Sequence, residues 1–186
     1  MTNCGHSHDC GGHTPLSVTQ TMDEMEFERG IWSAAMNGET HEVEKHLKRG
    51  VCVNKEDSYG FTALHYSVRN GHMEVSRVLL HYGANSNSQT RAGKVTPVHR
   101  AAYKGHLDLL KLLLKHGAKP EMVDADQKNA LHKAAENGHS PVVNYLVTSY
   151  SHLVGCHDNQ GKTPKDYISE RFPNLLHLFE AVKHNR

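Results

Sequence analysis

The chain has no excess of charge of either sign, which limits the partners it can attract by electrostatics alone. Lys and Arg total 21 and Asp and Glu total 20, so the formal net charge is +1 over 186 residues. A nucleic-acid-binding surface usually needs clustered basic residues, and a membrane surface attracts similar clusters. We therefore expect neither nucleic acid nor a membrane as a partner.

Long apolar runs are also missing. No stretch approaches the length that a membrane-spanning helix requires. The first residues show no basic region followed by an apolar core, so we expect no signal peptide. The cysteines are few, at positions Cys4, Cys10, Cys52 and Cys156, which favours a reducing, intracellular setting. The expected location is the cytoplasm, with the nucleus as a second compartment.

The motifs of common enzyme classes are absent as well. The sequence holds no Gly-rich phosphate loop, no HExxH and no GxSxG. Cys52 and Cys156 stand alone near the ends of repeated segments, so we interpret them as small packed residues rather than nucleophiles. We expect no enzymatic activity and no cofactor.

The chain does contain a short sequence motif in three copies. It reads Thr62-Ala63-Leu64-His65, then Thr96-Pro97-Val98-His99, then Asn129-Ala130-Leu131-His132. Each copy leads through a small-residue run to a Gly-His pair, at Gly71, Gly105 and Gly138. The histidines of successive copies lie 34 and 33 residues apart. Self-similarity at this period indicates a stacked repeat protein.

These motifs resemble those of the ankyrin repeat family, and the resemblance covers residues from about 25 to 182. The resemblance implies an all-α solenoid of about five helix-turn-helix units with protruding β-hairpin turns. Departures are Ala63 and Ala130 in place of Pro, Asn129 in place of Thr, and Gln127 in place of Gly. We expect a tail at 1–20, a capping repeat at 21–56, repeats at 57–89, 90–123 and 124–157, and a capping repeat at 158–186.

The residue types in the repeated motif predict the local structural role of each position. A Thr at the helix start accepts hydrogen bonds from free N–H groups of the first turn, and Pro97 suits the next position. The histidine one turn later is placed to bond the Thr hydroxyl and the turn backbone. Such histidines are better interpreted as structural than as metal ligands, because adjacent repeats lie about 10 Å apart. We expect Gly71, Gly105 and Gly138 to end their helices in a left-handed conformation.

The family resemblance also implies a surface for binding a partner protein, on the turn tips and the outward side of each first helix. Tyr, Phe and Arg in the second and third repeats predict an energetic centre there. An ordinary solvated face, with aromatics packed between tips, is the alternative. We expect a monomer that binds one or more intracellular proteins. The predicted contact residues are Tyr59, Phe61, Tyr66, Arg69, Asn70, Lys94, Arg100, Tyr103, Lys104, Lys128, Lys133 and Glu136.

A second possibility lies in the first thirteen residues. Cys4, His6, His8, Cys10 and His13 supply enough sulfur and imidazole ligands for one tetrahedral Zn²⁺ or Cu⁺ ion. The segment has no apolar residues to pack around such a site, and His-rich tracts also arise as low-complexity sequence. The alternative function is therefore a metal-responsive module in which this tail regulates partner binding.

Overall fold

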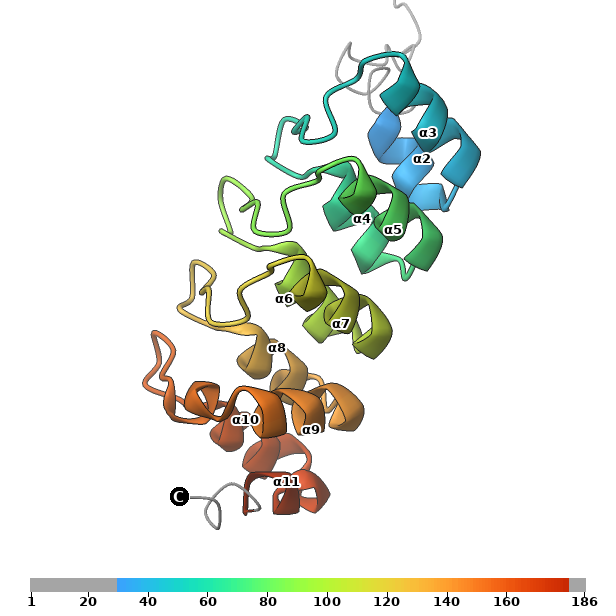
Figure 1. The fold of residues 1–186 in the computed structure, drawn as a ribbon. Coiled ribbons are helices and arrows are strands. Elements are labelled where there is room, and N and C mark those ends of the chain that lie inside the picture. Colours follow the sequence, from blue (N-terminus) through green and yellow to red (C-terminus); the bar gives the residue numbers. More distant parts are fainter. Residues whose placement is uncertain (1–29, 181–186) are drawn as a thin grey trace, which may run out of the picture.

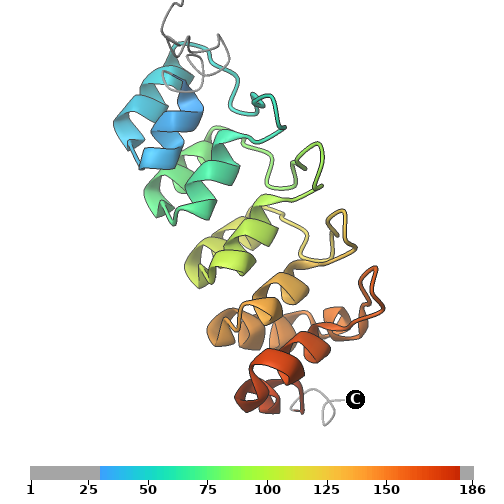
Figure 2. The same ribbon diagram turned by 180° about the vertical axis from the view of Figure 1, so that it is seen from behind.

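The computed structural model describes residues 30–180 as a row of paired helices (Figure 1). The pairs follow one another along the molecule in sequence order, and loops project from the same side of the row in both views (Figure 2). No residue from 30 to 180 is in a β-strand. Across the same residues, no helix is both long enough and apolar enough to cross a membrane.

Each unit contributes an inner helix, which lies nearer the projecting loops, and an outer helix (Figure 1). The inner helices are α2 (Ile31–Asn37), α4 (Ala63–Arg69), α6 (Pro97–Lys104), α8 (Ala130–Glu136) and α10 (Pro164–Arg171). The outer helices are α3 (Thr40–Lys48), α5 (Met73–His81), α7 (Leu107–Lys115), α9 (Ser140–Ser149) and α11 (His177–Glu180). Short 3₁₀ segments, η1 (Ser151–Gly155) and η2 (Pro173–Leu175), join the last elements.

The inner helices begin as the repeated motif predicts. In α6, the Thr96 hydroxyl accepts the His99 N–H, and His99 Nδ1 lies 2.8 Å from the same hydroxyl and accepts the Thr96 N–H at 3.1 Å. Thr62 with His65 and Asn129 with His132 form the same reciprocal cap. Because each side chain satisfies donors that the first turn leaves free, the cap fixes where the helix starts.

The end of α6 needs a glycine for two reasons, and α2, α4 and α8 end in the same way. Gly105 has φ of 74°, in the left-handed region that glycine adopts at little cost. In addition, a Cβ built on Gly105 would lie 2.6 Å from Nδ1 of His139, the N-cap residue of the next outer helix, α9. The prediction that Gly71, Gly105 and Gly138 adopt positive φ is confirmed.

The core runs the length of the row because every unit packs on its neighbours. Leu64, Leu110, Leu131 and Leu146 are fully buried. Small residues lie where inner helices approach, such as the fully buried Ala101 and Ala102, Ala134 and Ala135. A unit of this size cannot bury enough surface alone, so stability depends on stacking.

The projecting turns close without strand pairing. In the first complete turn, Asp57 N–H donates to the Phe61 carbonyl at 3.0 Å, and the Asp57 carboxylate accepts the Tyr59 and Phe61 N–H groups. The predicted hairpin turns are therefore present, but as tight turns, held by Asp57, Asp124 and Asp158 in three units and by Thr90 in the third unit. Their tips are also tied to one another, since Arg91 N–H donates to the Tyr59 carbonyl and Ala125 N–H to the Gly93 carbonyl.

Candidate recognition surface

One ring at the same place in each inner helix links neighbouring units. Nε2 of His65 lies 3.0 Å from the Val95 carbonyl, Nε2 of His99 lies 3.0 Å from the Lys128 carbonyl, and His132 reaches the Lys162 carbonyl. Trp32 plays the same part in α2, because its indole N–H donates to the Lys55 carbonyl at 3.0 Å. These contacts confirm the structural interpretation of the repeated histidines.

Burial keeps these histidines uncharged. It lowers the pKa of His65 and of His99 to about 4, and it lowers the pKa of His132 in the same direction. Each ring uses both nitrogens within the fold, so none presents a free base to a substrate. The residues that the structure describes contain no group of three or more His, Cys, Asp or Glu side chains placed to hold a metal ion.

The residue after the histidine position faces the turn of its own unit, and we call it the post-histidine residue. In α4 it is Tyr66, whose hydroxyl donates to the Asp57 carboxylate at 2.6 Å. In α10 it is Tyr167, which donates to Asp158 in the same way. An aspartate at the start of the turn thus serves both the turn backbone and the following helix.

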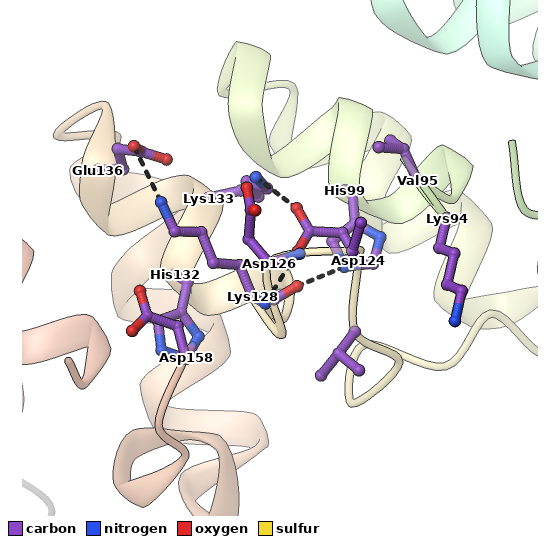
Figure 3. A network of polar contacts seen from close by, with 12 residues as sticks. Lys94, Val95, His99, Asp124, Asp126, Lys128, His132, Lys133, Glu136 and Asp158 are labelled. Carbon is purple, nitrogen blue, oxygen red and sulfur yellow. Dashed lines mark hydrogen bonds and ion pairs between the residues drawn. The ribbon is translucent and has the colours of Figure 1, made fainter. Parts of the chain in front are cut away.

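In the fourth unit these groups form a network of opposite charges (Figure 3). Lys133, the post-histidine residue of α8, forms an ion pair with Asp124, and Lys128 Nζ lies 3.2 Å from the Glu136 carboxylate. Burial alone would raise the pKa of Asp124, but the Lys133 ammonium and backbone N–H groups lower it below its usual value. The charges of this unit are therefore largely matched within the chain.

This network corrects one expectation from the sequence. Lys128 was expected at an exposed turn tip, but only 8% of its surface is accessible. Its ammonium lies 4.7 Å from the centre of the Tyr167 ring as well as against Glu136. The side chain turns back toward the next unit instead of outward, because an acceptor and an aromatic face are both within its reach. Lys133 is also mostly covered, with 15% of its side chain exposed.

The second and third units look different, because their side chains on this side are exposed. Tyr59 at the turn tip is 71% exposed, and Tyr103 at the end of α6 is 43% exposed. Arg69 in α4 is exposed as well, whereas Phe61 and Arg100 are half-buried. We call the surface formed by the turn tips and the exposed residues of the inner helices the turn-side face.

The remaining predicted contact residues lie on the same face, with differing freedom. Lys94 and Lys104 are exposed, and Lys104 Nζ lies 5.9 Å from the centre of the Tyr103 ring. Asn70 is exposed, but its amide donates to the Met36 carbonyl of the preceding unit at 2.9 Å. Lys94 occupies a left-handed conformation, φ 48°, at the turn position where Gly60, Gln127 and Gly161 also have positive φ.

Two further features were not visible in the sequence. Tyr82, which follows α5, is 42% exposed and was not predicted as a surface aromatic. The only signal was its place just before Gly83, outside the apolar stripe of that helix. Cys52, expected to be packed, is exposed, since it lies in the loop after α3 and not inside a helix pair. The proposed metal ligands Cys4, His6, His8, Cys10 and His13 lie outside the described residues.

Comparisons with known proteins agree with this architecture. A family model described as ankyrin repeats in three copies matches residues 7–90 and 84–159. The chain is 49% identical over 75 residues to ankyrin repeat domain-containing protein 39 of Homo sapiens, a match covering 40% of this chain and 41% of that protein. The Bos taurus protein of the same name is 49% identical over 69 residues, covering 37% of this chain and 35% of the relative.

A longer match reaches a much larger protein. The transient receptor potential cation channel subfamily A member 1 homolog of Caenorhabditis elegans is 31% identical over 155 residues, covering 83% of this chain and 12% of that protein. The matched segments thus span less than half of each relative, and the similarity concerns the repeats. With capped inner helices, glycine-ended pairs and a family model over most of its length, the chain belongs to the ankyrin repeat family.

Proposed function

We propose that the chain is a noncatalytic adaptor or scaffold that binds a partner protein through its turn-side face, the concave face in this family. One observation carries the proposal. Exposed or half-exposed aromatic and arginine side chains of the second and third units, Tyr59, Phe61, Arg69, Arg100 and Tyr103, share this face. Aromatic and arginine residues dominate the energetics of protein interfaces.

The scaffold under these side chains favours binding because it is already ordered. The backbone of Tyr59 accepts from Arg91 at 3.1 Å, which fixes one tip against the next. The Phe61 ring packs against His65 and Tyr66, with centroid distances of 5.6 Å in both cases. A surface that is rigid before binding loses less conformational entropy on association.

The absence of a free catalytic group supports a binding role over an enzymatic one. Along residues 30–180 the buried histidines are engaged at both nitrogens, and the turn aspartates Asp57, Asp124 and Asp158 are bonded to backbone and side-chain donors. Proteins of this family generally mediate protein–protein interaction. We place the encounter in the cytoplasm, with the nucleus as a second compartment, and we expect the chain to act as a monomer.

The test compares a double tyrosine variant of the turn-side face with a single tyrosine variant elsewhere. The variant Tyr59→Ala/Tyr103→Ala removes two aromatic rings from the turn-side face. Tyr82→Ala removes a ring at the end of outer helix α5 whose exposure, 42%, matches the 43% of Tyr103. We would capture partners from cell lysate with each protein and identify them by mass spectrometry. A partner retained by wild type and Tyr82→Ala but lost from the double variant supports the proposal.

The opposite pattern would contradict it. If every captured protein binds the double variant as well as wild type, and circular dichroism shows that all variants fold, then the turn-side face is not the binding surface. Loss of partners from Tyr82→Ala alone would move the site to the outer helices.

The alternative, a metal-responsive tail, rests on Cys4, His6, His8, Cys10 and His13 in the sequence. Its test is the double change Cys4→Ser/Cys10→Ser, followed by measurement of zinc content and of partner capture. Loss of both metal and partner supports regulation by the tail. Retention of partner binding after the change contradicts it.

A further inference from the structure

The post-histidine residue reveals one exception in the array. Tyr66, Lys133 and Tyr167 each bond an aspartate of their own turn, at Asp57, Asp124 and Asp158. The third unit has Arg100 at this position, but Thr90 stands where the other turns have aspartate. The Thr90 hydroxyl accepts the Val95 N–H at 3.0 Å and so replaces the turn-closing role of the aspartate. It offers no second carboxylate oxygen to Arg100.

The surroundings of Arg100 leave this charge unmatched. Its guanidinium lies over the Phe61 ring, 5.2 Å from the centroid, and Nε is buried with no hydrogen-bond partner. Among the side chains that the structure describes, none forms an ion pair with Arg100. Burial, followed by electrostatic repulsion from the Arg69 guanidinium, lowers the pKa of Arg100.

The charge of Arg69 is unmatched in the same way. The side chain is exposed on α4, and the described part of the chain supplies no carboxylate in ion-pair contact with it. The aspartate of its own turn, Asp57, already accepts from Tyr66 and from two backbone N–H groups. Two like charges held together with one buried donor unsatisfied cost free energy, unless something outside the fold neutralises them.

We propose that Arg100, with Arg69 beside it, binds a carboxylate from an acidic segment of the partner protein. The inference deepens the proposed function and rests on it. The partner carboxylate occupies the place that the Asp124 side chain takes beside Lys133 one unit further on. Arginine suits this role because its planar fork donates two parallel hydrogen bonds to a carboxylate.

The rest of the face favours a protein segment as the source of the carboxylate. Tyr59, Phe61 and Tyr103 provide apolar and aromatic surface for side chains flanking the acidic residue. The other basic residues of this face in the second and third units are few. Arg91 lies 3.8 Å from the Glu56 carboxylate, and Lys94 and Lys104 are exposed. The following unit neutralises its own charges. A short charged centre bordered by aromatics matches a peptide better than a nucleic-acid backbone, which needs an extended basic surface.

The experiment selects peptides without assuming their sequence. The full chain, its Thr90→Asp variant and its Arg100→Gln variant are each used to enrich binders from a random linear peptide library displayed on phage. We expect the peptides enriched on wild type to share an Asp or Glu at one position. Thr90→Asp supplies the missing internal carboxylate and keeps the charge of Arg100, so it should remove this preference without unfolding the chain.

Binding measurements with one enriched peptide then give the size of the effect. Changing its shared Glu to Gln, or changing Arg100→Gln in the protein, should weaken binding roughly ten- to hundredfold, as expected for a charge-assisted hydrogen-bonded pair. With Arg100→Gln in place, the Glu and Gln peptides should bind about equally, because the coupling between the two groups is gone. Thermal unfolding of each variant verifies that it is folded.

The outcomes separate the inference from the proposed function. If no acidic position is enriched, or if enrichment survives both Thr90→Asp and Arg100→Gln, the inference is wrong. If the selected peptides are not acidic but lose affinity on Tyr59→Ala/Tyr103→Ala, the turn-side face binds partners without the carboxylate. If none of these changes affects binding, the proposed function fails at this face as well.

Discussion

The inner helices α2, α4, α6 and α8 each end at a glycine whose backbone lies against a ring of the next unit, a contact that only the missing side chain allows. His72 covers Gly38, His106 covers Gly71 and His139 covers Gly105. Nε2 of His72 and of His139 also lies 2.8 Å from a carbonyl of the preceding unit. One residue type therefore ends a helix and opens space for a contact between units.

This double role predicts different costs for two similar substitutions. Gly105 and Gly117 both have positive φ, at 74° and 80°. A Cβ on Gly117 would meet nothing within 4 Å, whereas on Gly105 it would meet His139 at 2.6 Å. Gly117→Ala should therefore lower the free energy of unfolding by about 1 to 2 kcal/mol, the cost of the left-handed conformation.

Gly105→Ala should cost more, about 3 kcal/mol or above, because it adds displacement of the His139 ring and loss of its hydrogen bond. Urea unfolding followed by circular dichroism measures both values. Equal costs for the two substitutions would show that the ring moves away freely and that the contact contributes nothing.

At this scale the sequence predicted the repeated residues better than the variable ones. The histidine caps and the glycine ends recur, so their roles follow from spacing alone. The burial of Lys128 and the exposure of Cys52 depend on neighbours that spacing cannot locate. Lys128 is buried because Glu136 and Tyr167 approach it from different helices.

The inner helices share one design but differ at their first residue. Pro97 and Pro164 begin α6 and α10, whereas Ala63 and Ala130 begin α4 and α8. Proline suits this position because its φ is already helical and the N–H is normally unused. The residue before it must be extended, and Thr62 with ψ of 166° and Asn129 with ψ of 179° both are.

The two alanines differ in one hydrogen bond. The Ala130 N–H donates to the Pro120 carbonyl at 3.3 Å, whereas Ala63 donates no such bond in the part of the chain that the structure describes. Ala63→Pro should therefore raise the free energy of unfolding by about 0.4 to 1 kcal/mol through the entropy of the unfolded chain. Ala130→Pro should give no gain or a loss, because it removes a donor.

Thermal unfolding of the two variants beside wild type checks this pair. An increase for both substitutions would mean that the Ala130 bond has no net value. A decrease for Ala63→Pro would show that the ring does not fit at α4 as it does at α6.

The last helix pair shows how far the element pattern can be predicted. Asp166 stands where the preceding inner helices have histidine, and its carboxylate accepts from both the N–H and the hydroxyl of Thr163 at 2.7 Å. The cap is therefore kept in α10 by a different residue type. The departure from glycine at Gln127 was visible in the sequence, but the left-handed conformation that Gln127 and Lys94 both adopt was not.

Across the whole molecule, the links between units share one chemistry. Three of them pass through buried neutral histidines, and no unit is stable without its neighbours. Period and apolar pattern predicted this stack from the sequence. The sequence predicted the turn-side face only in part, because the exposure of Tyr59 and Tyr103 depends on side-chain packing. The missing carboxylate at Thr90 becomes clear when the contacts of the turns are compared in space.

Because such histidines link three of the interfaces between units, stability should depend on pH along most of the array. The folded-state pKa of His65 and of His99 is about 4, against about 6.5 in the unfolded chain, and that of His132 is lowered too. Between these values the unfolded chain binds protons that the folded chain excludes. Stability is therefore complete above pH 6.5 and is lost as the pH falls.

The expected slope is about 1.4 kcal/mol per pH unit for each fully titrating histidine, reached near pH 5. Urea unfolding at pH 7.5, 6, 5.5 and 5 measures it, in a window above the range in which Asp124 and Asp158, with their lowered pKa values, contribute. His99→Gln should unfold more easily at neutral pH, yet its slope should be smaller than that of wild type by about one histidine. A free energy of unfolding that stays constant from pH 7.5 to 5 would mean that the rings are protonated without breaking their links, and that the units are joined by apolar packing alone.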